Sequence, residues 1–116
     1  MLVEDQPFIA LDIEGVLEEN GYSDIVSITT CKETLLWLHD NVSLMAIIDP
    51  RVSDGICSDV VRHLADRQIP FVVYSGQPEP LVDKEPAFGV GQHLLKPAMP
   101  EDLIAAVRWA IGQICP

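Results

Sequence analysis

The most restrictive feature of the sequence is a short apolar run that ends in an Asp-Pro pair. Residues 44–48, Leu-Met-Ala-Ile-Ile, contain no polar side chain, and Asp49 and Pro50 follow directly. A short apolar run with polar flanks is typical of a strand buried on both faces. Pro50 cannot donate to a neighbouring strand and disfavours helical geometry at Asp49, so the strand should end there. The stretch predicts a central strand of an α/β sheet with a carboxylate at its carboxyl end.

Shorter apolar runs and helical patterns alternate along the rest of the chain. The further predicted strands are 1–4, 23–28, 71–74 and 92–95, and the predicted helices are 7–20, 31–40, 56–67 and a last one from residue 100 onward. Between 77 and 91, three prolines leave room for at most a short turn of helix. Such βα alternation predicts a parallel sheet with helices on both faces.

Composition argues against two classes of partner. Acidic side chains outnumber basic ones by 18 to 7, and a net charge of −11 leaves no basic patch for nucleic acid. No apolar run approaches the ~20 residues that cross a bilayer, and the N-terminus lacks the basic segment of a signal peptide. We therefore expect one domain, residues 1–116, in the cytoplasm, without direct contact to nucleic acid or membrane.

The three cysteines are Cys31, Cys57 and Cys115. Their number is odd, their spacings are wide, and they form no CxxC pair. This pattern favours free thiols in a reducing compartment over a disulfide or a metal site. We therefore predict that all three thiols are free.

Polar side chains follow four of the predicted strands. Glu4 and Asp5 follow the first, Asp49 the third, Ser75 the fourth and Lys96 the fifth. Because the carboxyl ends of parallel strands share one edge of the sheet, these side chains should meet in one cleft.

This set of groups is suited to phosphoryl transfer. Three neighbouring carboxylates repel one another unless a cation neutralises them, and oxygen ligands with room for water suit Mg²⁺. A carboxylate such as Asp49 is a nucleophile that can form an aspartyl phosphate. The Mg²⁺ and Lys96 would stabilise charge on the moving phosphoryl group, and Ser75 would donate a hydrogen bond to one of its oxygens.

Four motifs at these strand ends resemble response-regulator receiver domains, the phosphorylated partners in two-component signalling. They are Val-Glu-Asp-Gln-Pro at 3–7, Ile-Ile-Asp-Pro at 47–50 with Asp-Gly at 54–55, Val-Tyr-Ser-Gly at 73–76 and Leu-Leu-Lys-Pro at 94–97. The resemblance covers the whole chain and implies a flavodoxin-like (βα)5 three-layer sandwich with a five-stranded parallel sheet in the order 2-1-3-4-5. Pro-Phe at 70–71, with a glycine after Ser75, is similar to an alphaproteobacterial single-domain subgroup whose fourth helix is poorly formed.

The resemblance also implies roles for individual residues. Asp49 would be the phosphoacceptor, which receives its phosphate from a sensor histidine kinase. Asp5 would bind Mg²⁺ directly, Glu4 would act mainly through water, and the backbone carbonyl of Arg51 would supply a further ligand.

A second set of roles concerns the response to phosphorylation. Ser75 would be the switch hydroxyl and Lys96 would pair with the phosphate, while His93 lies where such domains carry an aromatic that rotates on activation. The Lys96–Pro97 peptide bond is expected to be cis. The surface around the last strand and the last helix would then change its binding of a downstream target or output domain.

Two residues are expected to tune hydrolysis of the phosphate, and one of them departs from the family pattern. Arg51, two residues after Asp49, stands where the family usually has an amide or a small polar residue. We predict that its bulk obstructs the attacking water and slows loss of the phosphate. Gln77, two residues after Ser75, is the other position expected to tune hydrolysis.

Other functions remain as alternatives. The main one is a phosphorylation-independent pseudo-receiver that acts as a protein-interaction module. We expect no turnover of an external substrate, since the segment after Asp49 lacks the second acid of aspartyl-phosphate hydrolases. A flavin site is disfavoured because no hydroxyl-rich loop follows the first strand. Homodimer formation is left open.

Overall fold

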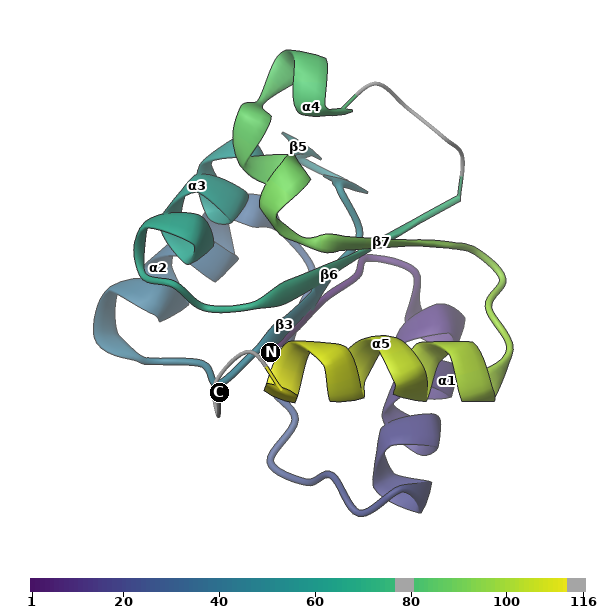
Figure 1. Cartoon of the computed structure of the whole chain (residues 1–116). Helices are drawn as coiled ribbons and strands as arrows, with labels where there is room; N and C mark the ends of the chain where they lie inside the picture. The colour runs from purple at the N-terminus through teal and green to yellow at the C-terminus, as the bar shows by residue number, and fades with distance from the viewer. Residues whose placement is uncertain (77–80, 113–116) are drawn as a thin grey trace.

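A computed structural model describes residues 1–76 and 81–112 as a parallel sheet between two layers of helices (Figure 1). The strands of this sheet are β1 (Leu2–Val3), β2 (Ser27–Ile28), β3 (Ala46–Ile48), β6 (Phe71–Ser75) and β7 (Gln92–Leu95). Their order across the sheet is β2-β1-β3-β6-β7. Counted along the chain this is 2-1-3-4-5, so the predicted flavodoxin-like topology is confirmed.

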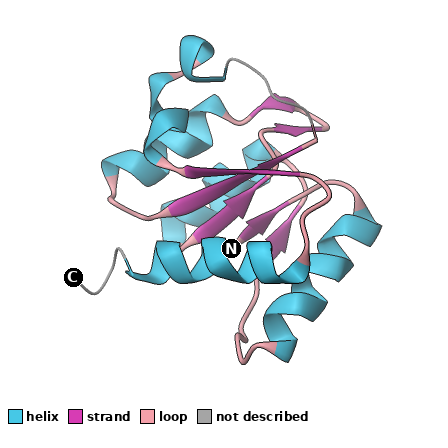
Figure 2. Cartoon of the chain, turned by 45° about the vertical axis from the view of Figure 1, so that its right-hand side comes forward, coloured by secondary structure: helices cyan, strands magenta, loops and turns pink. Residues whose placement is uncertain are grey.

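The helices cover both faces of the sheet, as Figure 2 shows. They are α1 (Pro7–Glu19), α2 (Cys31–Asp40), α3 (Ser58–Asp66), α4 (Leu81–Lys84), the 3₁₀ helix η1 (Pro86–Val90) and α5 (Pro100–Gly112). Between β6 and β7 the described chain forms only the short α4 and η1, as the prolines predict. No helix within 1–76 or 81–112 is both long and apolar enough to cross a membrane.

The central strands are buried on both faces, and their side chains alternate between the two layers. Leu2, Ile47 and Val72 are aligned across β1, β3 and β6 and pack toward α1 and α5. The next residue on each strand packs toward α2, α3 and η1; these residues are Val3, Ile48 and Val73. Burial of each such side chain contributes roughly 1.5–3 kcal/mol to folding, so the rows hold the carboxyl ends of the strands in register.

Three strands are shorter than predicted: β1 spans only Leu2–Val3 rather than 1–4, and the other two are β2 and β3. The run 23–28 pairs only at Ser27 and Ile28, because Asp24 has a left-handed backbone (φ 57°) that interrupts an extended strand. The run 44–48 pairs from Ala46 onward, and Leu44 lies outside the sheet with 65% of its surface exposed.

A small hairpin after Asp49 was not predicted. β4 (Arg51–Val52) and β5 (Gly55–Ile56) pair in antiparallel fashion, so α3 begins at Ser58 rather than near residue 56. The sequence does predict a turn at 53–55, and Gly55 supplies the positive φ of 119° that other residues rarely adopt. The hairpin places a short antiparallel segment directly after the end of β3.

The prediction of three free thiols is wrong for two cysteines. Cys31 and Cys57 form a disulfide, with their Cα atoms 5.5 Å apart, a separation ordinary for such bonds. The two residues are 26 positions apart in sequence, and they meet because the starts of α2 and α3 lie together. Cys115 lies outside the described residues.

Candidate functional site

The sheet brings the predicted polar residues to one rim. The N–H of Glu4 donates to Ile28 O (3.1 Å) and the N–H of Asp49 donates to Val3 O (2.8 Å), so both acids continue the ladder of the sheet. The N–H of Lys96 donates to Ser75 O (2.7 Å) in the same way. Backbone pairing therefore determines which side chains meet, before any side-chain contact is made.

An ammonium bridges two of the carboxylates. Lys96 Nζ lies 2.7 Å from Glu4 Oε2 and 2.9 Å from Asp49 Oδ2. The second oxygen of each acid accepts a backbone N–H two residues further on: Glu4 Oε1 from Gln6 (3.1 Å) and Asp49 Oδ1 from Arg51 (3.0 Å). Each carboxylate is thus held at both oxygens, as a preorganised site requires.

The charges in this cluster are shielded from water. Glu4 is 2% exposed and Asp49 9% exposed. Burial raises the pKa of Glu4, and the hydrogen bond from Lys96 only partly offsets that effect. Burial on its own would lower the pKa of Lys96, but its bonds to Glu4 and Asp49 outweigh burial and hold that pKa above 10.5. Lys96 is therefore cationic at neutral pH.

Three acids of the rim could hold a divalent cation. One carboxylate oxygen from each of Glu4, Asp5 and Asp49 lies within 4.8 Å of the other two. Glu4 and Asp49 are almost fully buried, whereas Asp5 is partly exposed and leaves room for water. Oxygen ligands with a water-accessible side fit Mg²⁺, which keeps several waters when it binds to proteins. The carbonyl of Arg51 stays a predicted ligand.

Asp49, the candidate nucleophile, lines a pocket of about 490 Å³. The pocket is lined by Asp49, Ser75 and Lys96, together with Gln6, Pro50, Arg51 and Gly76. Ser75 is 8% exposed, at the end of β6. The three residues predicted to handle a phosphoryl group therefore share one cavity large enough to admit it.

Sequence reasoning missed one residue that supports the site. Tyr74 lies beneath Lys96, whose Nζ is 5.6 Å from the centre of the Tyr74 ring. Its hydroxyl accepts the N–H of Ala98 (2.9 Å), just after the predicted cis bond between Lys96 and Pro97, which is present. The signal was available, since an aromatic residue directly precedes Ser75 on a strand that ends at the rim.

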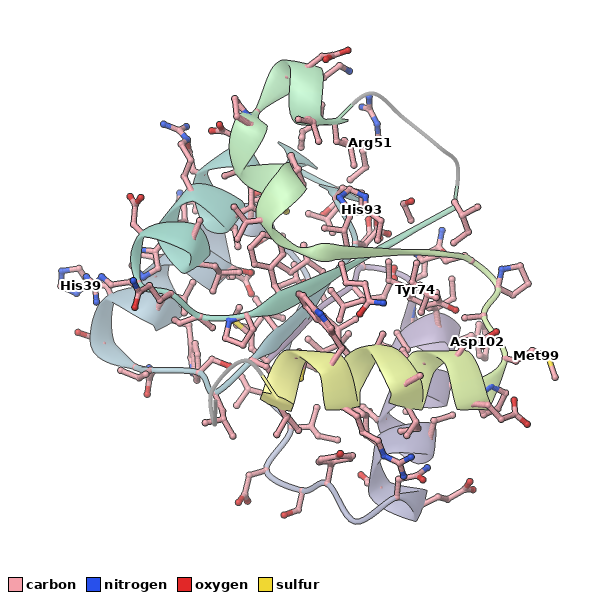
Figure 3. All side chains as sticks on the ribbon, viewed as in Figure 1. His39, Arg51, Tyr74, His93, Met99 and Asp102 are labelled. Carbon is pink, nitrogen blue, oxygen red and sulfur yellow. A yellow bond between two sulfur atoms is a disulfide. The ribbon has the colours of Figure 1, made fainter. Side chains whose placement is uncertain are left out.

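Two tuning or switch positions lie at the edge of the site. Figure 3 shows His93 on β7 and Arg51 on the hairpin, on the side of the molecule that carries α4 and η1. His93 Nε2 is 2.8 Å from Phe88 O in η1, and the side chain of Arg51 is exposed. Gln77, the other predicted tuning residue, lies outside the described residues.

Comparisons with known proteins agree with this geometry. No family model and no curated protein matches the sequence. Among solved structures, the response regulator PhyR from Brucella abortus is 29% identical, with a TM-score of 0.80; the match covers 97% of this chain and 46% of PhyR. The chain thus spans about half the length of that relative.

Two further structures match nearly end to end. A CheY-like response regulator receiver domain protein from Methanospirillum hungatei JF-1 is 17% identical, with a TM-score of 0.83 over 97% of this chain and 91% of the other. The receiver domain of a sensor histidine kinase from Pseudomonas aeruginosa PAO1 is 19% identical, with a TM-score of 0.80 over 96% and 94%. That domain has a magnesium ion coordinated in its active site cleft. The predicted resemblance to receiver domains is confirmed, and the finer subgroup motif stays a prediction.

Proposed function

We propose that this chain, which has the fold of response-regulator receiver domains and resembles them along its length, is a phosphoacceptor switch. Asp49 would receive a phosphoryl group from a sensor histidine kinase in a Mg²⁺-dependent reaction. The observation that carries the proposal is the Lys96 ammonium, held between Glu4 and Asp49 at an open pocket. An oxygen of Asp5 lies within 4.8 Å of oxygens of both acids. One cation and three acids at a pocket match the needs of phosphoryl transfer to a carboxylate.

The proposed reaction begins at an oxygen of Asp49. That oxygen forms a new bond to phosphorus while the bond from phosphorus to the donor imidazole nitrogen breaks. The nitrogen keeps the electron pair and is reprotonated from solvent. Lys96 lies within hydrogen-bond distance of Asp49 and would follow the charge onto the phosphoryl oxygens. The Ser75 hydroxyl, in the same pocket, would donate to another of those oxygens.

Glu4, Asp5, Asp49 and the backbone carbonyl of Arg51 would hold the Mg²⁺. The bound ion would neutralise the repulsion between the incoming phosphoryl group and the carboxylates. Support comes from the mutual approach of three acid oxygens within 4.8 Å and from the magnesium seen in the Pseudomonas receiver domain.

The proposed output surface surrounds β7 and the start of α5. Ser75 and Lys96 are joined by a backbone hydrogen bond, so movement of Ser75 toward a phosphoryl group would pull on the end of β7. Leu95 and Met99, close to that end, are 54% and 62% exposed. Such exposed apolar side chains suit a downstream protein target or an output domain. His93 would contribute to the change of this surface if its hydrogen bond to Phe88 O in η1 changes.

Phosphorylation of the purified protein by acetyl phosphate and Mg²⁺ tests the proposal. Intact-protein mass spectrometry should show one added phosphoryl group on the wild type and on Asp12→Asn, a control at an exposed acid of α1. Asp49→Asn should gain none. Equal labelling of Asp49→Asn, or a wild type that stays unmodified with both acetyl phosphate and phosphoramidate, would contradict it.

One observation favours the alternative of a phosphorylation-independent interaction module. Both oxygens of Glu4 and of Asp49 already have hydrogen-bond donors, so the rim is satisfied without a phosphate. Beryllofluoride with Mg²⁺ distinguishes the two functions. A phosphoacceptor should show amide NMR shifts around Ser75 and along β7, whereas an interaction module should show an unchanged spectrum.

A further inference from the structure

The disulfide lies where the starts of two helices meet. Cys31 is the first residue of α2, and Cys57 directly precedes α3. Cys57 is fully buried and Cys31 is partly exposed. We propose that this pair is a reversible redox modification site, which reacts by thiol–disulfide exchange with a small thiol of the glutathione class.

The exposure of the two cysteine residues determines the direction of the exchange. An external thiolate can reach Cys31 Sγ, so the new bond forms there while the bond between Cys31 and Cys57 breaks. Cys57 leaves with the electron pair as a thiolate. A second external thiol then attacks the external sulfur of the mixed disulfide and releases Cys31. The two-electron balance is one protein disulfide and two external thiols to two protein thiols and one external disulfide.

The setting of Cys57 favours it as the leaving group. Cys57 is the N-cap residue of the nine-residue α3 and its side chain makes no capping hydrogen bond, so the helix dipole there can stabilise a thiolate at Cys57. The start of α2 is different. Thr30 Oγ1 accepts Glu33 N–H (3.0 Å), and Asp54 accepts N–H groups from Cys31 and Lys32.

A stabilised leaving thiolate makes a disulfide easier to reduce. In the cytoplasm, where the sequence predicts this chain to be, disulfides are mostly transient or redox-sensing rather than structural. Both arguments point to a bond that opens and closes with the thiol pool, rather than one that is permanent.

The disulfide is connected to the proposed phosphoacceptor by a short, well-bonded segment. Cys57 N–H donates to Pro50 O (2.9 Å), and Arg51 N–H donates to Asp49 Oδ1 (3.0 Å). The β4–β5 hairpin lies between these two bonds. It is attached to α2 through the Asp54 carboxylate, 2.8 Å from Cys31 N, and the residue after it, Cys57, is attached to α2 through the disulfide. Reduction removes the covalent attachment, so the hairpin should open more often.

The first experiment measures the redox equilibrium. The full chain is equilibrated in buffers with increasing ratios of oxidised to reduced glutathione, quenched in acid and alkylated, and its thiols are counted by intact mass. Cys115→Ser should pass reversibly from two free thiols to none across the series. Cys31→Ser and Cys57→Ser should form no internal disulfide. A pair that stays oxidised in reduced glutathione, or stays reduced in oxidised glutathione, would overturn the proposal.

The second experiment measures, in the Cys115→Ser background, how strongly the disulfide holds the hairpin against α2. Hydrogen exchange of the amides of 51–56, and of Lys32, should be several-fold faster in the reduced protein and in Cys31→Ser/Cys57→Ser. Exchange in α5 should not change. Equal exchange at the hairpin in both redox states would overturn the coupling. Neither readout involves phosphate, so a failure of the proposed phosphoacceptor function would leave both results interpretable.

Discussion

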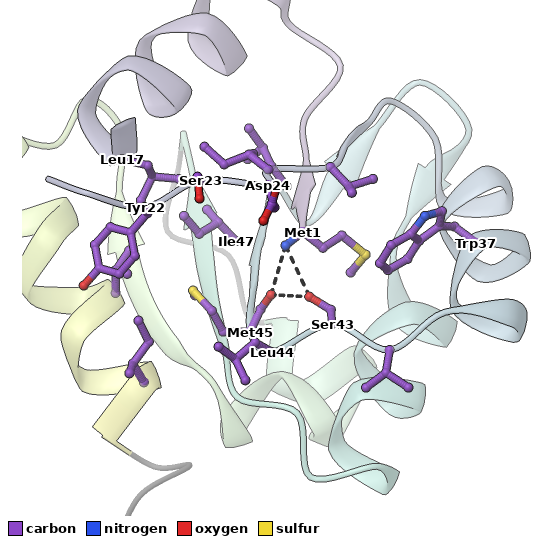
Figure 4. Close-up of a pocket in the computed structure, with 16 residues that line it drawn as sticks. Met1, Leu17, Tyr22, Ser23, Asp24, Trp37, Ser43, Leu44, Met45 and Ile47 are labelled. Carbon is purple, nitrogen blue, oxygen red and sulfur yellow. Dashed lines mark hydrogen bonds between the residues drawn. The ribbon is translucent and has the colours of Figure 1, made fainter. Parts of the chain in front are cut away.

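The two ends of the sheet each hold an ammonium in a pocket, but they treat its charge in opposite ways. At the carboxyl end, Lys96 bridges two carboxylates, and its pKa is raised because these bonds outweigh burial. At the amino end, the Met1 ammonium donates to two neutral oxygens, Ser43 Oγ (3.2 Å) and Met45 O (3.1 Å) (Figure 4). There burial lowers the pKa of the Met1 ammonium, since both of its hydrogen-bond partners are neutral oxygens.

The difference separates a site built for charge from a site built for packing. The amino-end pocket, about 390 Å³, is lined mainly by apolar side chains such as Leu17, Trp37 and Ile47. The carboxyl-end pocket contains charged groups of both signs, positioned to bind an incoming anion and a divalent cation. Substitutions at the carboxyl end should therefore change chemistry, and those at the amino end should change stability.

The largest effect is expected from Lys96→Met. It removes the cation that would stabilise the transferred phosphoryl group, so phosphorylation by acetyl phosphate should slow by about 10³-fold, as when one transition-state donor is lost. Lys84→Met, at an exposed lysine of α4, is the control and should react as the wild type. Initial rates of mass labelling measure both. A Lys96→Met rate within about twofold of the control would remove Lys96 from the proposed chemistry.

The next largest effect is expected on stability, at the amino-end pocket. Ile47→Ala leaves a cavity at a 2%-exposed position of β3 and should lower the free energy of unfolding by about 3 kcal/mol. Leu44→Ala, at a 65%-exposed residue of the same pocket, should cost less than about 0.5 kcal/mol. Urea unfolding measures both, and the folded fraction of Ile47→Ala should still phosphorylate at the wild-type rate. A large loss of labelling in folded Ile47→Ala would show that the two ends are not separable.

Addition of Mg²⁺ should stabilise only a protein with an intact carboxyl end. At Mg²⁺ concentrations well above the dissociation constant, the wild type should gain about 1–3 kcal/mol in unfolding free energy. Asp5→Asn should lose most of that gain, and Asp12→Asn, on the exposed face of α1, should keep it. Thermal melts with and without Mg²⁺ give the comparison. Equal gains in Asp5→Asn and Asp12→Asn would mean that the ion binds elsewhere.

The carboxyl end could be predicted more completely than the amino end, for a physical reason. Each strand that ends in a polar residue is a local pattern, and parallel topology alone brings Glu4, Asp49, Ser75 and Lys96 together. The amino-end pocket has no such pattern, because its lining combines strand residues such as Leu2 and Ile47 with loop and helix residues that are brought together by long-range contacts.

The disulfide, the Asp54 hydrogen bonds and the hairpin were missed for the same reason, because each depends on contacts that the local sequence pattern does not show. The disulfide joins residues 26 positions apart, and the Asp54 carboxylate is bonded to N–H groups 22 and 23 positions away. Neither contact leaves a periodic trace in the sequence. The turn of the hairpin could be predicted from the sequence. The pairing of Arg51 with Ile56 could not, because it depends on the direction of the backbone after the end of β3.

Glu4→Gln should change the pH dependence of stability, because folding shifts the pKa of Glu4. Burial raises the pKa of Glu4 above its ordinary 4.5, so its contribution to stability is fully present below that pH. The contribution is lost as pH rises through the folded-state pKa. The stability of Glu4→Gln relative to wild type should therefore rise with pH from 4.5 upward and then level off. Urea unfolding without Mg²⁺ at a series of pH values measures this, and a difference that falls with pH would reverse the assignment.

The smallest effect concerns the lifetime of the phosphate. Arg51 is an exposed, bulky residue of the hairpin that lines the pocket, and its backbone N–H already contacts Asp49. If its side chain obstructs the attacking water, Arg51→Asn should lose its aspartyl phosphate several-fold faster, because the backbone contact is kept and only the bulk is removed. Arg67→Asn, at an exposed arginine just after α3, is the control. Decay is followed by mass after the acetyl phosphate is removed. Slower decay in Arg51→Asn would mean that Arg51 assists the water instead, and the pocket would then owe its phosphate lifetime to other residues.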